Sequence, residues 1–397
     1  MDDGTPNSVY RDPLALWFVT EAYRIADTGE LIGAAGERLL AAGIPLCRLA
    51  YFQFTLHPEL DGKAYFWRRG RGVEVAAAGP GLRQRSEYLD NPLPKVFEEL
   101  KTIRVHLAEV EPQAPILKQL KSQGATDYVA LPLLFTTGHV DALSIVSDAP
   151  GGFLAADLDR MFLLQFAFTR IVEIHSLRDT AENLLDAYVG RAAGRRILAG
   201  EVKRGDGQTI EAVIWYSDLR GFTRASDSLP RDAVITLLND YFGATGEAVT
   251  AAGGEILKFL GDGMLAMFPV PSPAERSATA TRALWAAAAA AETIATLNVA
   301  RAAAGEIEVR FGLALHIGEV MFGNIGASKR LDFTVIGPAV NFASRLEKLC
   351  AELNRSLVVS DAMARLLPQN AIGSLGHHAL KDIDEPQEVY GVRGISA

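Results

Sequence analysis

The sequence predicts a mixed α/β protein built from more than one domain. Its 397 residues exceed the ~150 residues of an ordinary domain. Hydrophobic residues make up 49% and charged residues 22% of the chain, which is the balance of a folded globular protein. Stretches with strand spacing alternate with stretches with helical spacing through most of the sequence.

Composition and charge exclude several classes of function. Acidic residues outnumber basic ones by 48 to 39, for a formal charge of -9, which argues against nucleic-acid binding through a basic surface. The two cysteines, Cys47 and Cys350, lie far apart, so a disulfide framework is excluded. No stretch reaches the ~18 consecutive apolar residues of a membrane span, and the polar N-terminus lacks a signal-peptide core. We therefore expect a soluble, cytoplasmic protein.

Residues 1–156 are expected to form one α/β unit. Residues 13–42 have helical spacing, and Gly43 and Pro45 end that helix. Strand-like runs follow at residues 47–56, 64–68, 127–135 and 140–146. The last two flank a hairpin turn at residues 136–138, and the segment before them is loop-rich with one short helical stretch.

A long helix is predicted over residues 157–197, inside a linker that spans residues 157–207. Five of its residues fall alternately three and four apart, the spacing of a coiled-coil seam: Ile174, Leu177, Ala181, Leu184 and Tyr188. Two interpretations remain open, namely one buried amphipathic helix, or a helix paired with its copy in a dimer. Glycines then accumulate between residues 190 and 207, which places a domain boundary there.

A second domain is expected over residues 208–397, where strands and helices alternate. Strands are predicted at residues 210–216, 308–317 and 388–392, and helices at 231–251, 277–303 and 338–349. Residues 255–268 read as a hairpin bent at Gly261, Asp262 and Gly263. Pro338 stands at the first position of its helix, where proline is favoured.

Two aspartates stand where chemistry is expected. Asp218 follows an apolar strand and precedes a glycine turn, and Asp262 lies between two glycines at the hairpin tip. Such carboxylates can hold a metal ion that bridges phosphate oxygens, while backbone N–H groups bind the anion. Each aspartate alone would more often be a turn residue or a helix cap, so the pair depends on the rest of the pattern.

Four sequence blocks, in this order, resemble the catalytic domain of class III adenylyl and guanylyl cyclases: WYSDLRGFT, EILKFLGDGMLAMF, LHIGEVMFGNIG and FTVIGPAVNFASRLE. The resemblance covers about residues 208–392. It implies a mostly antiparallel sheet flanked by helices, and a reaction that converts ATP to 3′,5′-cyclic AMP and pyrophosphate. It also implies a homodimer in which both chains contribute to each active site.

The resemblance assigns the phosphate end of the site. Asp218, Asp262 and the backbone carbonyl of Leu219 would hold two divalent cations per site, Mg²⁺ or Mn²⁺. The turn formed by Gly221, Phe222 and Thr223 would cradle the β- and γ-phosphates.

The remaining assignments concern the ribose, the α-phosphate and the terminal phosphates. Asn341 would orient the ribose and Arg345 would stabilise charge on the α-phosphate, and their spacing of four puts both on one helix face. Lys381 matches a lysine that contacts the terminal phosphates, although a surface lysine is the alternative interpretation.

Two further positions select the base. Lys258 stands where adenylyl cyclases keep lysine, and Thr334 stands where many of them have aspartate. The threonine resembles a bacterial-type subclass, some of whose members respond to bicarbonate. A threonine hydroxyl both donates and accepts hydrogen bonds, so base selection would rest mainly on Lys258.

Residues 1–156 resemble a GAF domain in the order of their elements, with a PAS-like domain as the alternative. The sequence therefore predicts a cytoplasmic homodimeric adenylyl cyclase with an N-terminal sensor for a small-molecule regulator. Guanylyl cyclase activity is one alternative, and a catalytically silent sensor or scaffold that binds a ligand without turnover is another.

Overall fold

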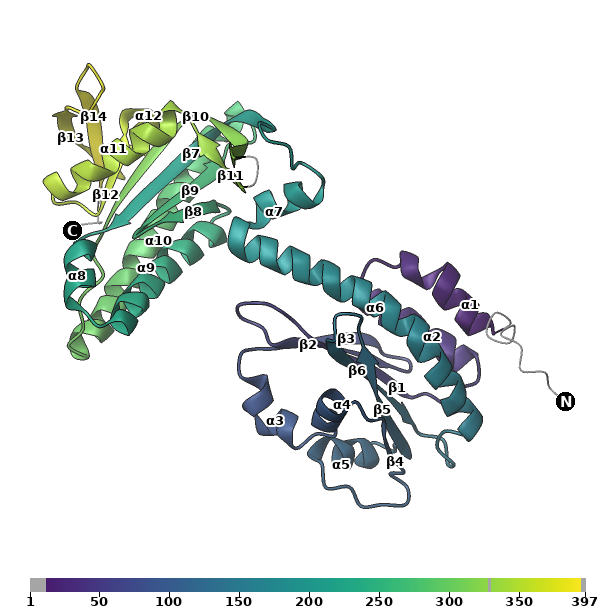
Figure 1. Cartoon of the computed structure of the whole chain (residues 1–397). Coiled ribbons are helices and arrows are strands. Elements are labelled where there is room, and N and C mark those ends of the chain that lie inside the picture. Colours follow the sequence, from purple (N-terminus) through teal and green to yellow (C-terminus); the bar gives the residue numbers. More distant parts are fainter. Residues whose placement is uncertain (1–11, 328–329, 394–397) are drawn as a thin grey trace. The chain divides into compact units, whose positions relative to one another are not determined.

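The computed structural model describes residues 12–327 and 330–393 of the chain (Figure 1). The chain divides into two compact units, Met1–Ala187 and Tyr188–Ala397. Both units combine helices with largely antiparallel sheets, which is the mixed α/β fold that the sequence predicts.

The N-terminal unit is a six-stranded antiparallel sheet in the order β3-β2-β1-β6-β5-β4. Its strands are β1 (Arg48–Phe54), β2 (Gly62–Arg68), β3 (Gly72–Ala78), β4 (Ile103–Val105), β5 (Asp127–Leu134) and β6 (Val140–Ser147). Its helices are α1 (Pro13–Thr20), α2 (Thr28–Ala41), α3 (Ser86–Leu89), α4 (Leu93–Glu99), α5 (Pro115–Ser122) and the first part of α6 (Ala155–Val189), with 3-10 turns η2 (Ala22–Arg24) and η3 (Leu82–Gln84).

Each face of this sheet carries its own core. Helices α1, α2 and α6 pack on one face and α4 and α5 on the other, as Figure 1 shows. Helix α2 lies directly against β2. The packing is so close that a Cβ added to Gly36 would stand only 2.3 Å from the ring of Trp67. Burial of these apolar faces on both sides stabilises the sheet.

The helix expected over residues 13–42 is wrong in extent, since the structure divides it in two. Asp12 accepts a hydrogen bond from the Leu14 amide and Asp27 accepts one from the Glu30 amide, so each aspartate begins a separate helix. The segment expected to be loop-rich also contains more order than predicted, namely β3, β4 and three short helices. The strands and the turn at residues 136–138 are confirmed.

The C-terminal unit contains an eight-stranded sheet in the order β13-β14-β12-β10-β7-β9-β8, with β11 paired to β10. Its strands are β7 (Gly207–Leu219), β8 (Glu255–Leu260), β9 (Gly263–Pro269), β10 (Phe311–Ala327), β11 (Arg330–Ile336), β12 (Leu357–Ser360), β13 (Ile372–His378) and β14 (Gln387–Val392). Its helices are α7 (Arg191–Leu198), α8 (Phe222–Ser228), α9 (Arg231–Ala251), α10 (Arg276–Ala303), α11 (Pro338–Glu352) and α12 (Asp361–Ala364), with the 3-10 turn η4 (Pro273–Glu275).

All pairings in this sheet are antiparallel except that of β10 with β12. Helices α9 and α10 cover one face, and α11 covers the other together with the β10–β11 hairpin. Phe333 and Val335 of β11 pack with residues of β7 and β9, so the hairpin folds back over the sheet. This fold brings β11 beside β8, at the far edge of the strand order.

Two of the predicted helices have informative details. The single helix expected over residues 157–197 is wrong in extent: α6 ends at Val189, and α7 begins after Gly190, whose φ of 92° is left-handed. The segment Pro273–Ala303 is long and apolar enough to cross a membrane by length and composition alone. A core helix meets the same criteria, and the buried alanines of α10 belong to the core that it forms with α9 and the sheet.

Candidate functional site

The predicted aspartates lie side by side at one end of the sheet. Asp218 stands near the C-terminal end of β7 and Asp262 in the turn between β8 and β9. The Leu219 amide donates both to Asp218 Oδ1, at 3.1 Å, and to the Asp262 carbonyl, at 3.2 Å. Burial, the Asp262 charge and a hydrogen bond between the two carboxyls raise the pKa of Asp218 to about 6. The structure thus brings together the two carboxylates that the sequence pairs.

Several neighbours hold this end of β7 in place. Ser217 Oγ accepts hydrogen bonds from Trp215 Nε1, at 3.0 Å, and from the Tyr241 hydroxyl, at 2.7 Å. On the next strand, Gly263 is required, because an added Cβ would lie 2.9 Å from the Ser217 carbonyl and 3.2 Å from Asp218 Oδ1. The buried hydrogen bonds hold Ser217, the residue before Asp218, and the lack of a side chain at Gly263 leaves room for the Asp218 carboxylate.

The turn that the sequence predicts to bind phosphates follows Asp218 directly. Gly221 adopts a φ of 73°, and α8 begins at Phe222. The first amides of a helix have no carbonyl partner within that helix, so this turn presents N–H groups beside the two carboxylates. Phe222 is partly buried against the core, which anchors the turn.

The carboxylate pair is a chemically suitable site for divalent cations. Carboxylate oxygens are the ligands that Mg²⁺ and Mn²⁺ prefer, and a cation would offset the repulsion that raises the pKa of Asp218. Within residues 12–327 and 330–393, no group of three or more His, Cys, Asp or Glu side chains has metal-binding geometry. The protein would therefore supply two carboxylates, leaving the remaining ligands to backbone, water and substrate.

A third carboxylate lies near the pair and was missed by sequence reasoning. Burial, with the nearby charge of Asp218, raises the pKa of Glu347 to about 7. A Cβ added to Gly312, the register partner of Asp218 on β10, would lie 2.3 Å from Glu347 Oε1. Glu347 stands in α11, two residues after Arg345, so nothing in its spacing indicated that it faces the aspartates.

The predicted base-selecting residues also come together. Lys258 lies on β8 and Thr334 on β11, and the two strands are joined by an ion pair from Lys258 Nζ to Asp332 Oδ2 at 3.0 Å. Thr334 is only 6% exposed. Asp332 was not predicted, although its position two residues before Thr334 places both on one face of the strand.

The predicted ribose and phosphate residues lie on and beside α11. Asn341 is exposed, and Arg345 is half-buried with its Nη2 3.2 Å from Asp382 Oδ2. That ion pair brings the segment of Lys381 next to α11, although Lys381 itself points to solvent with an exposed side chain. Leu380 packs into the same small core as Leu346 of α11, which fixes this segment.

The predicted residues therefore form three groups in the C-terminal unit. The first is the two aspartates with the turn that follows Asp218, the second is Lys258 with Thr334, and the third is Asn341 with Arg345 on α11. In the described part of the chain, no hydrogen bond or ion pair connects Asp218 or Asp262 to Lys258, Asn341 or Arg345.

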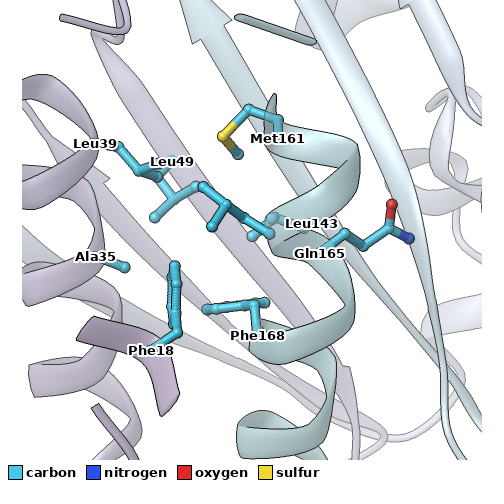
Figure 2. Close-up of a pocket in the computed structure, with 9 residues that line it drawn as sticks. Phe18, Ala35, Leu39, Leu49, Leu143, Met161, Gln165 and Phe168 are labelled. Carbon is cyan, nitrogen blue, oxygen red and sulfur yellow. The ribbon is translucent and has the colours of Figure 1, made fainter. Parts of the chain in front are cut away.

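Five aromatic residues of the N-terminal unit could line a pocket or fill its core. Trp17, Tyr51, Tyr65 and Trp67 are buried in the core, whereas Phe54 lies outside that cluster and is partly buried. Figure 2 shows the side chains around a cavity beside α6. Its volume is about 10 Å³. It is lined by Phe18, Ala35, Leu39, Leu49, Leu143, Met161, Leu164, Gln165 and Phe168. A cavity of this size admits about one water-sized sphere, so it holds no small-molecule ligand as it stands.

Comparison with known proteins concerns mainly the C-terminal unit. Residues 207–392 match the family described as "Adenylate and Guanylate cyclase catalytic domain". "Adenylate cyclase 1" of Rhizobium meliloti (strain 1021) is 27% identical over 70% of this chain and 43% of its own length. "Adenylate cyclase" of Anabaena cylindrica is 31% identical over 54% of this chain and 42% of its own. The chain thus spans less than half the length of these two curated relatives.

Among solved structures, the adenylyl cyclase CyaB from P. aeruginosa is 29% identical and aligns with a TM-score of 0.43. The alignment covers 47% of this chain and 95% of that chain.

Proposed function

We propose that this chain, whose residues 207–392 match the adenylate and guanylate cyclase catalytic domain family, converts ATP to 3′,5′-cyclic AMP and pyrophosphate. The observation that carries the proposal is the adjacent Asp218–Asp262 pair beside a turn of free amides. The adenylate cyclases among the relatives support the same reaction class.

The reaction joins the ribose 3′-oxygen to the α-phosphorus, breaks the bond from that phosphorus to the bridging oxygen, and releases pyrophosphate. Asp218, Asp262 and the Leu219 carbonyl would hold Mg²⁺ or Mn²⁺, which stabilise the charge on the phosphates when bound. Gly221, Phe222 and Thr223 would bind the β- and γ-phosphates through their amides. Asn341 would orient the ribose, Arg345 would stabilise the charge that develops on the α-phosphate, and Lys381 would contact the terminal phosphates.

The base would be read by Lys258 and Thr334. The ammonium group of Lys258 donates to a ring nitrogen of adenine, and the Thr334 hydroxyl lies on the neighbouring strand. GTP is the competing substrate, since a hydroxyl both donates and accepts.

We also propose that the N-terminal unit is a GAF-like sensor for a small molecule and that the protein works as a homodimer. The six-stranded antiparallel sheet with helices on both faces supports the first part. The second part is supported by the separation of the predicted residues into groups that no hydrogen bond or ion pair joins among the described residues. Bicarbonate remains a candidate regulator through the threonine position.

The test is direct. The purified chain is incubated with ATP or GTP in the presence of Mg²⁺ or Mn²⁺, and the products are separated by chromatography. We expect 3′,5′-cyclic AMP from ATP, and a loss of at least ~10³-fold in kcat for Asp218→Asn or Asp262→Asn, since a metal ion supplies several kcal/mol of transition-state stabilisation.

Asp232→Asn provides a matched control. Asp232 is exposed on the first turn of α9, so this substitution removes the same charge elsewhere in the unit. Cyclic GMP as the main product would replace the proposal with guanylyl cyclase activity. Ligand binding without any product would favour the silent scaffold.

A further inference from the structure

The ion pair between Lys258 and Asp332 links two strands that are distant in the sequence. Lys258 Nζ donates to Asp332 Oδ2 at 3.0 Å, across 74 positions of the chain. The lysine side chain is 31% exposed and the aspartate side chain 53%. The Asp332 carboxylate therefore faces the same solvent-accessible space as the Lys258 ammonium group. The ion pair uses only part of the hydrogen-bonding capacity of the ammonium group, which has three N–H donors.

A buried hydroxyl lies on the same strand face. Thr334 is two residues from Asp332 in β11, so the alternation of a strand directs both side chains to one side. Thr334 is 6% exposed, and its Oγ1 has no hydrogen-bond partner among the residues that the structure describes. Buried hydroxyls are normally hydrogen-bonded, so this atom is suited to a partner that a ligand supplies.

A lysine alone does not separate adenine from guanine. The ammonium group only donates, and both purines offer it acceptors, namely N7 in either base and O6 in guanine. The two bases differ where adenine carries a 6-amino donor and guanine a 6-oxo acceptor. A carboxylate only accepts hydrogen bonds, so its presence beside the lysine favours the amino group and repels the oxo group.

We propose that Asp332 is a specificity-determining residue of the base site. It holds the Lys258 ammonium group in position and adds a negative charge that favours the 6-aminopurine over the 6-oxopurine. The Asp332 carboxylate can only accept a hydrogen bond from the base, whereas the Thr334 hydroxyl can also donate one. This inference rests on the proposed cyclase function and names the residue that sets its substrate class.

The experiment compares kcat and KM for ATP and for GTP in the unmodified chain and in Asp332→Asn, Asp332→Glu and Glu211→Gln. Exposed ion pairs contribute little to folding, so Asp332→Asn should remain folded, which its thermal melting checks. Glu211→Gln is the matched control, because Glu211 forms a similar ion pair with Arg276, at 2.7 Å, on β7 of the same sheet.

We expect Asp332→Asn to lower the ratio of kcat/KM for ATP to that for GTP by about tenfold or more, the size of one lost charge-assisted hydrogen bond. The change should appear mainly in KM, because base contacts are made equally in the ground and transition states. Asp332→Glu should recover part of the ratio, and Glu211→Gln should leave it unchanged. Calorimetry with non-reactive α,β-methylene analogues should show weaker binding of the ATP analogue and tighter binding of the GTP analogue.

An unchanged ratio in Asp332→Asn would overturn the inference, whether or not both activities fall together. A chain that turns over neither nucleotide would instead contradict the proposed function. In that case the analogue-binding measurement still decides the role of Asp332.

Discussion

His316 is a partly buried titratable residue on β10 of the C-terminal unit. Its Nδ1 lies 2.9 Å from Ser360 Oγ, and its ring stacks on Phe342 with centroids 4.4 Å apart. Burial lowers the pKa of His316 to about 4, whereas an unfolded histidine titrates near pH 6.5. The folded state therefore requires the neutral ring.

The first prediction concerns the pH dependence of stability. Above pH ~6.5 His316 is neutral in both states, so its contribution is fully present. As the pH falls from there toward 4, the unfolded chain binds the proton first, and we expect a loss of at most about 3 kcal/mol in the free energy of unfolding. Urea denaturation at a series of pH values measures this loss.

His316→Gln should remove this part of the acid dependence, because glutamine does not titrate. His377→Gln, at an exposed position on β13, should retain it. Equal acid dependence in the unmodified chain and in His316→Gln would show that another group is responsible.

At the scale of elements, α6 carries two different faces. One face packs into the N-terminal core through residues such as Phe168 and Val172. Three of the five predicted seam residues are exposed instead, at 62% for Ile174, 51% for Leu177 and 84% for Tyr188, while Ala181 and Leu184 are partly buried. The early turns are thus buried within the chain, and pairing of the later turns with a second copy stays a prediction.

The second prediction follows from that seam. If a paired helix couples the sensor to the cyclase, inserting or deleting one residue near Asp179 rotates the seam and should change basal activity by about fivefold or more, the usual lower range of coupling. Activity is measured together with the oligomeric state by sedimentation. Insertion of a whole heptad is the control, since it preserves the register. Indifference of a dimeric protein to both single-residue changes would exclude this coupling.

At the scale of the whole molecule, the proposed active site requires two chains. One chain would contribute Asp218, Asp262 and the phosphate turn, and the facing chain would contribute Lys258, Thr334, Asn341 and Arg345. A symmetric homodimer then contains two complete sites. The ion pairs of Lys258 with Asp332 and of Arg345 with Asp382 keep the second set ordered in the single chain.

The third prediction tests this division. Arg345→Ala should cost about 10²–10³-fold in kcat, the range for one transition-state charge donor, and Asp218→Ala should be nearly inactive. After subunit exchange between the two variants, each mixed dimer has one intact site and one doubly defective site. Activity per mixed dimer should then return to about half of the normal value. Exchange that is verified by differently tagged subunits but restores no activity would refute the shared site.

The sequence by itself determined the features that depend on neighbouring residues. Local patterns of glycine, proline and apolar spacing predict the turn at Asp262, the helix of Asn341 and Arg345, and the strand that leads to Asp218. Local capping also explains one error in extent, because Asp27 begins a new helix inside an otherwise continuous helical pattern.

Only the tertiary structure decided which charged groups meet. Asp332 reaches Lys258 across 74 positions and Asp382 reaches Arg345 across 37, because the β10–β11 hairpin and the segment after β13 fold back onto other elements. Glu347 likewise faces Asp218 because Gly312 leaves space on the strand between them. Local spacing contains no information on these contacts, since they arise from the path of the chain through the sheet and from the packing of α11 on it.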